Sequence, residues 1–270
     1  MNDQKHPTSD LPLFGTKAHD EPSVFTPNSL LCEARRQKDL PDGSVPDICI
    51  LDPDGDIVQH LSETDQATAD PTWPGYHTDL HRFEHNSETF GIVGCAVGAP
   101  FAVLVAEQLF ASGCEFLISI TSSGQIQQRD EPPYFVLIER ALRDEGTSHH
   151  YCQPEKYAVL DTDLRERIEA ECDSVSRPVY TGATWTTDAP FRETQAAIER
   201  ARSEGILAVE MEAAALYTFA AVRDYPVVCF AHVTNRMGQS EEDFEKGEAN
   251  GSQDALEVIE VAASTWRSMT

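Results

Sequence analysis

The fold is decided by the stretch TFGIVGCAVGAPFAVLVA at residues 89–106, which contains no charged residue. An uncharged stretch of this length could cross a membrane as a helix. It is interrupted, however, by Gly91, Gly94, Gly98 and Pro100, and such interruptions are typical of a strand, a tight turn and a helix in succession. The stretch therefore predicts one strand-to-helix unit of a globular protein rather than a membrane span.

The same alternation continues on both sides of this unit. The predicted strands are 48–51, 90–97, 115–120, 134–139, 178–185, 205–209 and 227–233. The predicted helices are 101–112, 161–172, 190–204, 210–223 and 252–266, with Pro190 suited to a first helical turn. Runs of this kind predict an α/β layer fold around a mainly parallel or mixed central sheet. The long loop expected at 121–133 follows a buried strand, and α/β proteins bind ligands at such strand ends.

Two parts of different character divide the chain. Residues 1–46 are polar and proline-punctuated and show no sustained hydrophobic period, so we expect an irregular N-terminal arm. The regular alternation begins near Asp47, and we expect a single domain over residues 47–270.

Charge and cysteine usage exclude several classes of protein. Lys and Arg number 20 and Asp and Glu number 46, which gives a net charge of −26. Such a chain repels a phosphate backbone, so we expect no binding to nucleic acid.

The seven cysteines are scattered, with no CxxC pair, as in proteins of a reducing compartment. The first residues lack a basic segment followed by an apolar one. We therefore expect a cytoplasmic protein with no membrane partner.

The segment VEMEAAA at residues 209–215 places two carboxylates where a short strand runs into a helix. Acidic residues are favoured in a first helical turn by the helix dipole, and that is one explanation of Glu210 and Glu212. The other starts from their apolar neighbours, because a carboxylate among Met211 and the alanines needs hydrogen-bond donors, and ligand hydroxyls are candidates.

Two further segments carry polar groups that could meet a ligand. TSSG at 121–124 offers hydroxyls and backbone amides after an apolar strand, and it is either a polar nest for a ligand or an ordinary turn. ALRDEGTS at 141–148 is either part of a site or a solvated loop with Arg143 in a surface ion pair. The chain has no GxGxxG after a strand, no GxxxxGK[ST], no HExxH and no GxSxG, so we expect no nucleotide cofactor and no metal site.

Six segments in this order and approximate spacing resemble the purine nucleoside phosphorylase and uridine phosphorylase superfamily, which also holds nucleosidases. They are CAVGAPFAVLVAEQL, TSSGQI, ALRDEGTSHHY, TWTTDAPFRE, LAVEMEAAALY and HVTNR, and the resemblance covers residues 47–265. It implies a three-layer single domain whose mixed sheet partly closes as a barrel, assembled as a homodimer or homohexamer. It also implies cleavage of a nucleoside N-glycosidic bond, with no cofactor and with inorganic phosphate as co-substrate.

The resemblance also implies roles for particular residues. Glu212 is the expected carboxylate that grips the ribose, with Met211 packed on the sugar and Ser122 at the acceptor. The other expected substrate-binding residues are Gly98, Ser123, Gly124, Arg143, Phe191, Arg192 and Glu210.

Asn235 stands where relatives acting on aminopurines have an aspartic acid that protonates the leaving base. An asparagine donates a hydrogen bond but supplies no proton. We therefore expect an oxo-base, such as uracil or a 6-oxopurine, whose departing charge spreads onto a carbonyl oxygen.

The acceptor side departs from the phosphorylase pattern, because the first loop, LDPDGD at 51–56, lacks the arginine of that pattern and Ser119 stands near a second arginine position. Three readings stay open. One is a phosphorylase, as the family implies. Another is a nucleosidase in which Asp56 activates water, although Asp56 also suits an ordinary turn. The last is a non-catalytic nucleoside-binding paralogue. The segment 238–251 is either a lid whose Phe244 and Lys246 reach the site or an exposed loop.

Overall fold

A mixed ten-stranded sheet forms the centre of the protein, whose computed structural model describes residues 12–15, 17–237 and 244–270. The strands are β1 (Ile48–Asp52), β2 (Ala67–Ala69), β3 (Leu80–His85), β4 (Glu88–Gly94), β5 (Phe116–Gln125), β6 (Tyr134–Asp144), β7 (Tyr157–Val159), β8 (Val179–Thr187), β9 (Ile206–Glu210) and β10 (Val227–Asn235). The α-helices are α1 (Pro27–Lys38), α2 (Asp56–Glu63), α3 (Ala99–Ala111), α4 (Thr162–Glu171), α5 (Gln195–Ser203), α6 (Ala213–Arg223) and α7 (Ser252–Met269).

Strand β5 is shared between the open part of the sheet and a barrel. Its first half pairs in parallel with β1, and it also pairs in parallel with β10 and, at its end, antiparallel with β9. The β10–β5 pairing closes β5, β10, β6, β8 and β9 into a five-stranded ring, while β1, β4, β3 and β2 extend the sheet outward. This confirms the expected mixed sheet that partly closes as a barrel.

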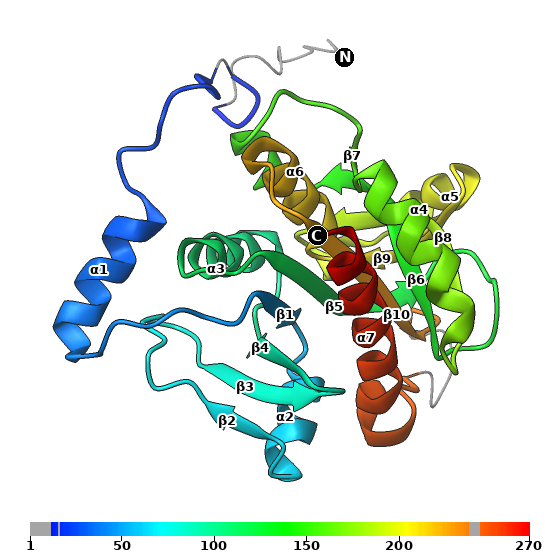
Figure 1. Ribbon diagram of the computed structural model, residues 1–270. Helices are drawn as coiled ribbons and strands as arrows, with labels where there is room; N and C mark the ends of the chain where they lie inside the picture. The colour runs from blue at the N-terminus through cyan, green and yellow to red at the C-terminus, as the bar shows by residue number, and fades with distance from the viewer. Residues whose placement is uncertain (1–11, 16, 238–243) are drawn as a thin grey trace.

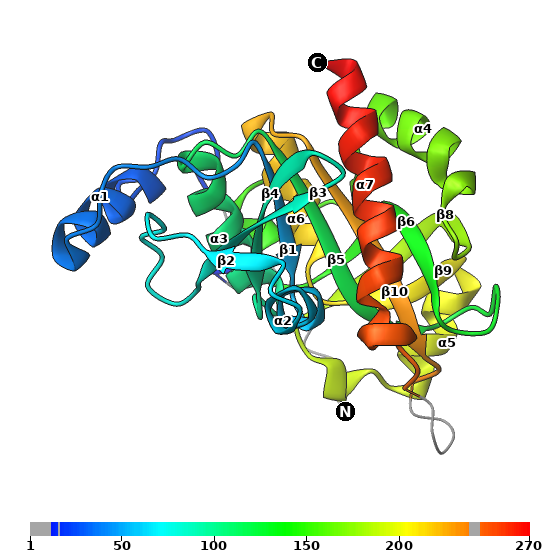
Figure 2. The ribbon, with the colours of Figure 1, turned by 60° about the horizontal axis from the view of Figure 1, so that its bottom comes forward.

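Helices cover both faces of the sheet. Figure 2 shows α7 in front of β5 and β10, and α6 behind the strands. Helix α3 contacts α6 and β1. Most of its side chains from Ala99 to Phe110 are apolar, and most of its surface is therefore buried. The carboxyl ends of β1, β5 and β10 consequently meet between two covered faces, where polar side chains are shielded from water.

Several boundaries differ from the expected ones for local reasons. Residues 121–125 continue β5 as strand, because β10 and β9 supply hydrogen-bond partners that the sequence alone does not reveal. The helix expected from Pro190 is a short 3-10 turn, and α5 begins only after Thr194, whose hydroxyl accepts from the Ala197 N–H at 3.3 Å. The helix expected from Glu210 begins at Ala213.

The N-terminal arm, expected to be irregular, contains helix α1. Thr26 caps the helix by accepting from the Ser29 N–H at 3.2 Å, and Leu31 and Ala34 are buried. Figure 1 shows α1 at the edge of the molecule, on the far side of α3 from the barrel strands. None of the helices in the described ranges is long and apolar enough to cross a membrane.

Candidate active site

The Glu212 carboxylate is buried where β9 passes into α6, and only 1% of the residue is exposed. Oε1 accepts from the Gly98 N–H at 2.6 Å, and Oε2 accepts from the Thr121 hydroxyl at 2.7 Å. Burial, together with the neighbouring Glu210 carboxylate, raises the pKa of Glu212 to about 7. The Met211 N–H also donates to Oε2, at 3.3 Å. Since a carboxylate has about four acceptor positions, these three bonds leave one for a ligand hydroxyl.

Glu210 lies two residues earlier but faces protein donors on both of its oxygens. Oε2 accepts from the N–H groups of Glu212 and Ala213, each at 2.7 Å, and so caps the first turn of α6. Oε1 accepts from the hydroxyls of Thr184, at 3.1 Å, and Thr186. Burial raises the pKa of Glu210 above its usual value. Its expected contact with substrate stays a prediction, and this geometry favours a structural role.

The end of β5 presents three polar side chains in succession, which Gly124 follows. Thr121 holds Glu212, whereas the Ser122 hydroxyl lies 2.9 Å from the Thr234 hydroxyl of β10. The Ser123 hydroxyl is buried and has no hydrogen-bond partner within the described residues. A Cβ at Gly124 would lie 2.2 Å from the Met237 sulfur, so a side chain there would require the Met237 side chain to move. The predicted TSSG segment therefore lies beside Glu212.

Asn235 ends β10 opposite Gly124 on β5. Its Oδ1 accepts from the Met237 N–H at 2.9 Å, which orients the carboxamide with Nδ2 on the other side. Nδ2 lies 3.2 Å from the Thr234 hydroxyl and 3.4 Å from the Ser123 carbonyl. Both N–H groups of Nδ2 thus have protein acceptors, and a ligand carbonyl would replace one of these long hydrogen bonds.

Three aspartates lie where β1 passes into α2: Asp52 ends the strand, Asp54 lies in the turn and Asp56 begins the helix. Asp52 accepts from the N–H groups of Gly55 and Val58, so it holds the turn into α2, and burial raises its pKa to about 7. Asp54 crosses to β5 instead, where its Oδ2 accepts from the Ser122 N–H at 3.0 Å. Burial is the main cause that raises the pKa of Asp54.

Lys246 reaches this loop from the other end of the chain. Its Nζ lies 2.5 Å from the Asp56 carboxylate and 3.8 Å from that of Asp54. Burial alone would lower the pKa of Lys246, but its hydrogen bond to Asp56 and the charges of Asp54 and Asp56 raise it. The segment 238–251 was expected to be either a lid whose Phe244 and Lys246 reach the site or an exposed loop. The position of Lys246 fits the first of these. Phe244 is 68% exposed, and residues 238–243 lie outside the described residues.

Three other expected residues lie apart from the carboxylates. Arg143 is buried and holds the loop after β6, donating to the Ser148 hydroxyl at 2.8 Å and to the Gln153 carbonyl at 3.0 Å. Phe191 is 99% exposed, and Arg192 beside it is also exposed. Since Phe191 packs against none of the residues that the structure describes, its expected place over the base stays a prediction.

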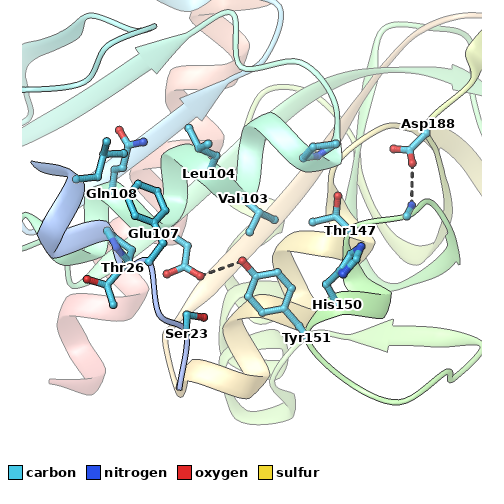
Figure 3. Close-up of a pocket in the computed structure, with 15 residues that line it drawn as sticks. Ser23, Thr26, Val103, Leu104, Glu107, Gln108, Thr147, His150, Tyr151 and Asp188 are labelled. Carbon is cyan, nitrogen blue, oxygen red and sulfur yellow. Dashed lines mark hydrogen bonds between the residues drawn. The ribbon is translucent and has the colours of Figure 1, made fainter. Parts of the chain in front are cut away.

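A cavity of about 600 Å³ lies between the N-terminal arm and α3. Figure 3 shows Leu104 and Thr26 among its lining residues, and it shows Asp188 bonded to the loop after β6. In that bond the Gly146 N–H donates to Asp188 at 2.7 Å. The cavity and the carboxylate site share helix α3, since Gly98 at its N-terminus donates to Glu212 while Leu104 lines the cavity.

Sequence reasoning did not single out Thr121 or Asp54 as site residues. It named Asp56 as the residue that would activate water, and that role stays a prediction. The sequence did indicate that a carboxylate could contact β5, because the DPDGD loop has three acidic residues and any of them could turn toward that strand. Within the described ranges, no group of three His, Cys, Asp or Glu side chains is arranged to hold a metal ion.

Comparison with known proteins adds a family to this geometry. A family model described as the phosphorylase superfamily matches residues 47–264. The chain is 25% identical to a uridine phosphorylase of Thermococcus kodakarensis, over 68% of this chain and 70% of that protein. It is 27% identical to a guanosine phosphorylase of Halorubrum lacusprofundi, over 48% of this chain and only about half, 54%, of that protein.

The solved structures give the same result for the fold. A crystal structure of uridine phosphorylase from Vibrio fischeri, complexed with 6-hydroxy-1-naphthoic acid, superposes with a TM-score of 0.68 at 18% identity. The superposition covers 86% of this chain and 93% of that one. At this identity the likeness supports the shared architecture.

Proposed function

The chain belongs to the phosphorylase superfamily, and from this we propose that it cleaves the N-glycosidic bond of a nucleoside and releases the free base. The observation that carries the proposal is the buried Glu212 carboxylate, held by the Gly98 N–H and the Thr121 hydroxyl beside the polar end of β5. A carboxylate fixed in a water-poor site is suited to a sugar that becomes positively charged.

Glu212 would act on the sugar. Breaking the bond between C1′ and the base leaves an oxocarbenium-like sugar, and a nearby carboxylate stabilises that charge while its hydrogen bonds to the ribose hydroxyls tighten. Met211, which is partly exposed next to it, would pack on the sugar. Glu212 therefore contributes more in the transition state than in the ground state, which is what accelerates a reaction.

Asn235 and Ser123 would hold the base. The Asn235 Nδ2 and the Ser123 hydroxyl, which has no partner in the described part of the chain, both lie at the β5–β10 end of the barrel. They can bond to a carbonyl oxygen that gains negative charge as the base leaves, but asparagine cannot protonate a ring nitrogen. This favours an oxo-base, with uridine and inosine as the nucleosides of choice.

We expect the purified protein to release base from uridine or inosine at least 100-fold faster than from adenosine or methylthioadenosine, because the aminopurines need a proton that Asn235 lacks. Chromatography of the free bases measures the four rates. Cleavage of adenosine as fast as of uridine and inosine would overturn the assignment of Asn235. Nucleoside binding without release of any base would support the non-catalytic paralogue instead.

The pH dependence follows from Glu212. Its pKa is raised to about 7, and the ionised form is the one that stabilises a cationic sugar. The ionised fraction grows as pH rises, so kcat/KM is expected to increase about tenfold per pH unit below pH 7 and to level off above it. Steady-state rates between pH 5 and 9 measure the profile, and a flat profile would contradict this role.

The identity of the acceptor does not follow from cleavage itself. Phosphate is the acceptor named by the family, while hydrolysis is favoured by one specific observation, the aspartate-rich first loop with Lys246 as its ion-pair partner. The use of phosphate and assembly as a homodimer or homohexamer stay predictions.

A further inference from the structure

We propose that the cavity between the N-terminal arm and α3 is a second binding site, which takes an uncharged nucleobase and is separate from the site at Glu212. The choice of a nucleobase rests on the proposed function, because a protein that cleaves nucleosides releases free base. The cavity volume of about 600 Å³ lies in the range of small-molecule sites in proteins.

Several parts of the chain form the walls of this cavity. The arm contributes residues between 23 and 30, α3 contributes residues between 100 and 108, and the loop after β6 contributes residues between 146 and 151. Figure 3 shows side chains from these segments around it. Of the described residues that line the cavity, none is Glu212 or Asn235, so a ligand here would not occupy the place proposed for the substrate.

Gln108 is the polar group that indicates a ligand. Only 5% of the residue is exposed, it lines the cavity, and its carboxamide has no hydrogen-bond partner among the described residues. Buried polar groups in proteins nearly always have a partner, because leaving one unbonded costs free energy. A carboxamide places an NH₂ donor beside a carbonyl acceptor. A ligand that presents an acceptor beside a donor would therefore satisfy both ends of Gln108.

Nucleobases carry that arrangement on their edges. Uracil and hypoxanthine present a ring N–H beside a carbonyl, and adenine presents a ring nitrogen beside an amino group. The side chains of Asn and Gln form such paired hydrogen bonds with adenine when proteins read DNA. Gln108 can pair with any of these bases, so the cavity would not share the preference for oxo-bases that we propose for Asn235.

The other walls suit the faces of a flat ring. Val103, Leu104 and Leu30 supply aliphatic surface, and Phe25 and Tyr151 supply aromatic rings on which a base can stack. Leu104 is 43% exposed and Phe25 is 70% exposed. A bound base would cover part of this apolar surface and remove it from water, which favours binding.

The charge of the lining favours an uncharged ligand over a nucleotide. The described residues that line the cavity include the carboxylates of Glu107 and Asp188 and no lysine or arginine. Glu107 accepts from the Tyr151 hydroxyl at 2.9 Å. A phosphate group normally gains charge-assisted hydrogen bonds from arginine or lysine, and here it would face two carboxylates. The net charge of −26 also opposes the approach of any anion.

Two cations lie behind the lining, and both contact residues that belong to it. Arg223 lies 3.5 Å from the Glu107 carboxylate. The Lys17 ammonium lies 2.9 Å from the His150 Nδ1, and burial together with this charge lowers the pKa of His150. His150 is therefore neutral at pH 7 and adds no positive charge to the cavity.

The experiment counts the bases that each chain binds. Equilibrium dialysis with radiolabelled hypoxanthine compares the wild-type protein with Gln108→Leu and Asn235→Ala. The first variant keeps the size of the side chain and removes both hydrogen-bonding groups, whereas the second weakens the site near Glu212. Gln59→Leu is the matched control, since it makes the same change at an exposed glutamine of α2 that does not line the cavity. Thermal melting shows that each variant is folded.

We expect the wild type and Gln59→Leu to bind two molecules of hypoxanthine per chain. Gln108→Leu and Asn235→Ala should each bind one at the same free concentration, since the loss of a pair of hydrogen bonds weakens affinity roughly tenfold or more. In Asn235→Ala, unlabelled adenine should displace the label and AMP should not. Gln108→Leu should release base from inosine at the wild-type rate, because Gln108 is outside the site at Glu212.

Leu104→Trp provides an independent check, because the larger side chain fills part of the cavity. It should remove the same binding event as Gln108→Leu. A second copy of the chain is the alternative occupant of this surface. If Leu104→Trp dissociates an assembly in sedimentation velocity and leaves hypoxanthine binding unchanged, the cavity is an interface between copies and the inference is wrong.

Failure of this inference is distinguishable from failure of the proposed function. One molecule of hypoxanthine per chain in both the wild type and Gln108→Leu would overturn the second site and leave the proposed cleavage intact. No release of base from any nucleoside, together with binding that Gln108→Leu removes, would overturn the proposed cleavage and support the second site.

Discussion

Glu212→Ala is expected to lower turnover by roughly 10²- to 10³-fold or more, the loss seen when one preorganised electrostatic group is removed from a transition state. The reason is that Glu212 is the buried carboxylate next to the site proposed for the sugar, and alanine can neither balance a developing positive charge nor accept from the ribose hydroxyls. Single-turnover rates of base release measure the effect, and a fully active variant would exclude Glu212 as the sugar-binding group.

Glu212→Gln provides the matched comparison, since it keeps the shape of the side chain and removes the charge. Folding raises the pKa of Glu212 from its ordinary value of 4.5 to about 7, so the free energy of unfolding falls as pH rises from about 4.5 to about 7 and levels off above that. The glutamine variant should therefore lose activity at pH 8 and melt at the same temperature as the wild type or higher. A much lower melting temperature in the glutamine variant would mean that the charge serves the fold rather than the reaction.

Glu210→Ala should have the largest effect on stability. The substitution leaves four donors without a partner inside the protein, namely the N–H groups of Glu212 and Ala213 and the hydroxyls of Thr184 and Thr186. We expect the free energy of unfolding to fall by roughly 3–5 kcal/mol, as when one side of a buried polar network is removed. Chemical denaturation followed by circular dichroism measures the loss.

Glu210→Gln separates a structural role from contact with substrate. Its carbonyl oxygen can still accept from the two backbone N–H groups, while its NH₂ group can donate to the two threonine hydroxyls, which act as acceptors as well as donors. The glutamine variant should therefore recover most of the stability and keep an unchanged KM. A normal melting temperature with a strongly raised KM would instead support the substrate contact expected from the sequence.

The layer order of the fold follows well from the sequence, because each strand from β4 to β10, apart from the short β7, has a run of apolar or β-branched residues of its own. The expectation that the sheet closes as a barrel was based on the resemblance to a family and not on these runs. It depends on β5 pairing with β1, β10 and β9 together, and no local pattern reports that one strand has three neighbours. For the same reason residues 121–125 looked like a loop.

For the site, too, the sequence predicted the segments involved but not the contacts between them. Glu212 and the TSSG segment lie together, since TSSG is the end of β5, Glu212 follows β9, and the ends of these two strands pair. The contact between Asp54 and Ser122 joins residues 68 positions apart, and within a loop of three aspartates the sequence gives no reason to prefer one of them. For a related reason the sequence did not distinguish the roles of Glu210 and Glu212. The preference for acidic residues at a helix start does not show which of two acids accepts from the backbone N–H groups of the first turn.

The ion pair of Asp56 with Lys246 also bears on how the protein is made, because its members are 190 residues apart. At roughly 5–20 residues per second, the ribosome needs about 10–40 s to progress from one to the other. During that interval the aspartates of the first loop have emerged, while the lysine that neutralises them has not yet been synthesised. A nascent chain thus carries an uncompensated cluster of negative charge in its first strand-to-helix turn. The last tenth of translation therefore supplies the lysine that pairs with Asp56 and reduces a repulsion built in near the beginning.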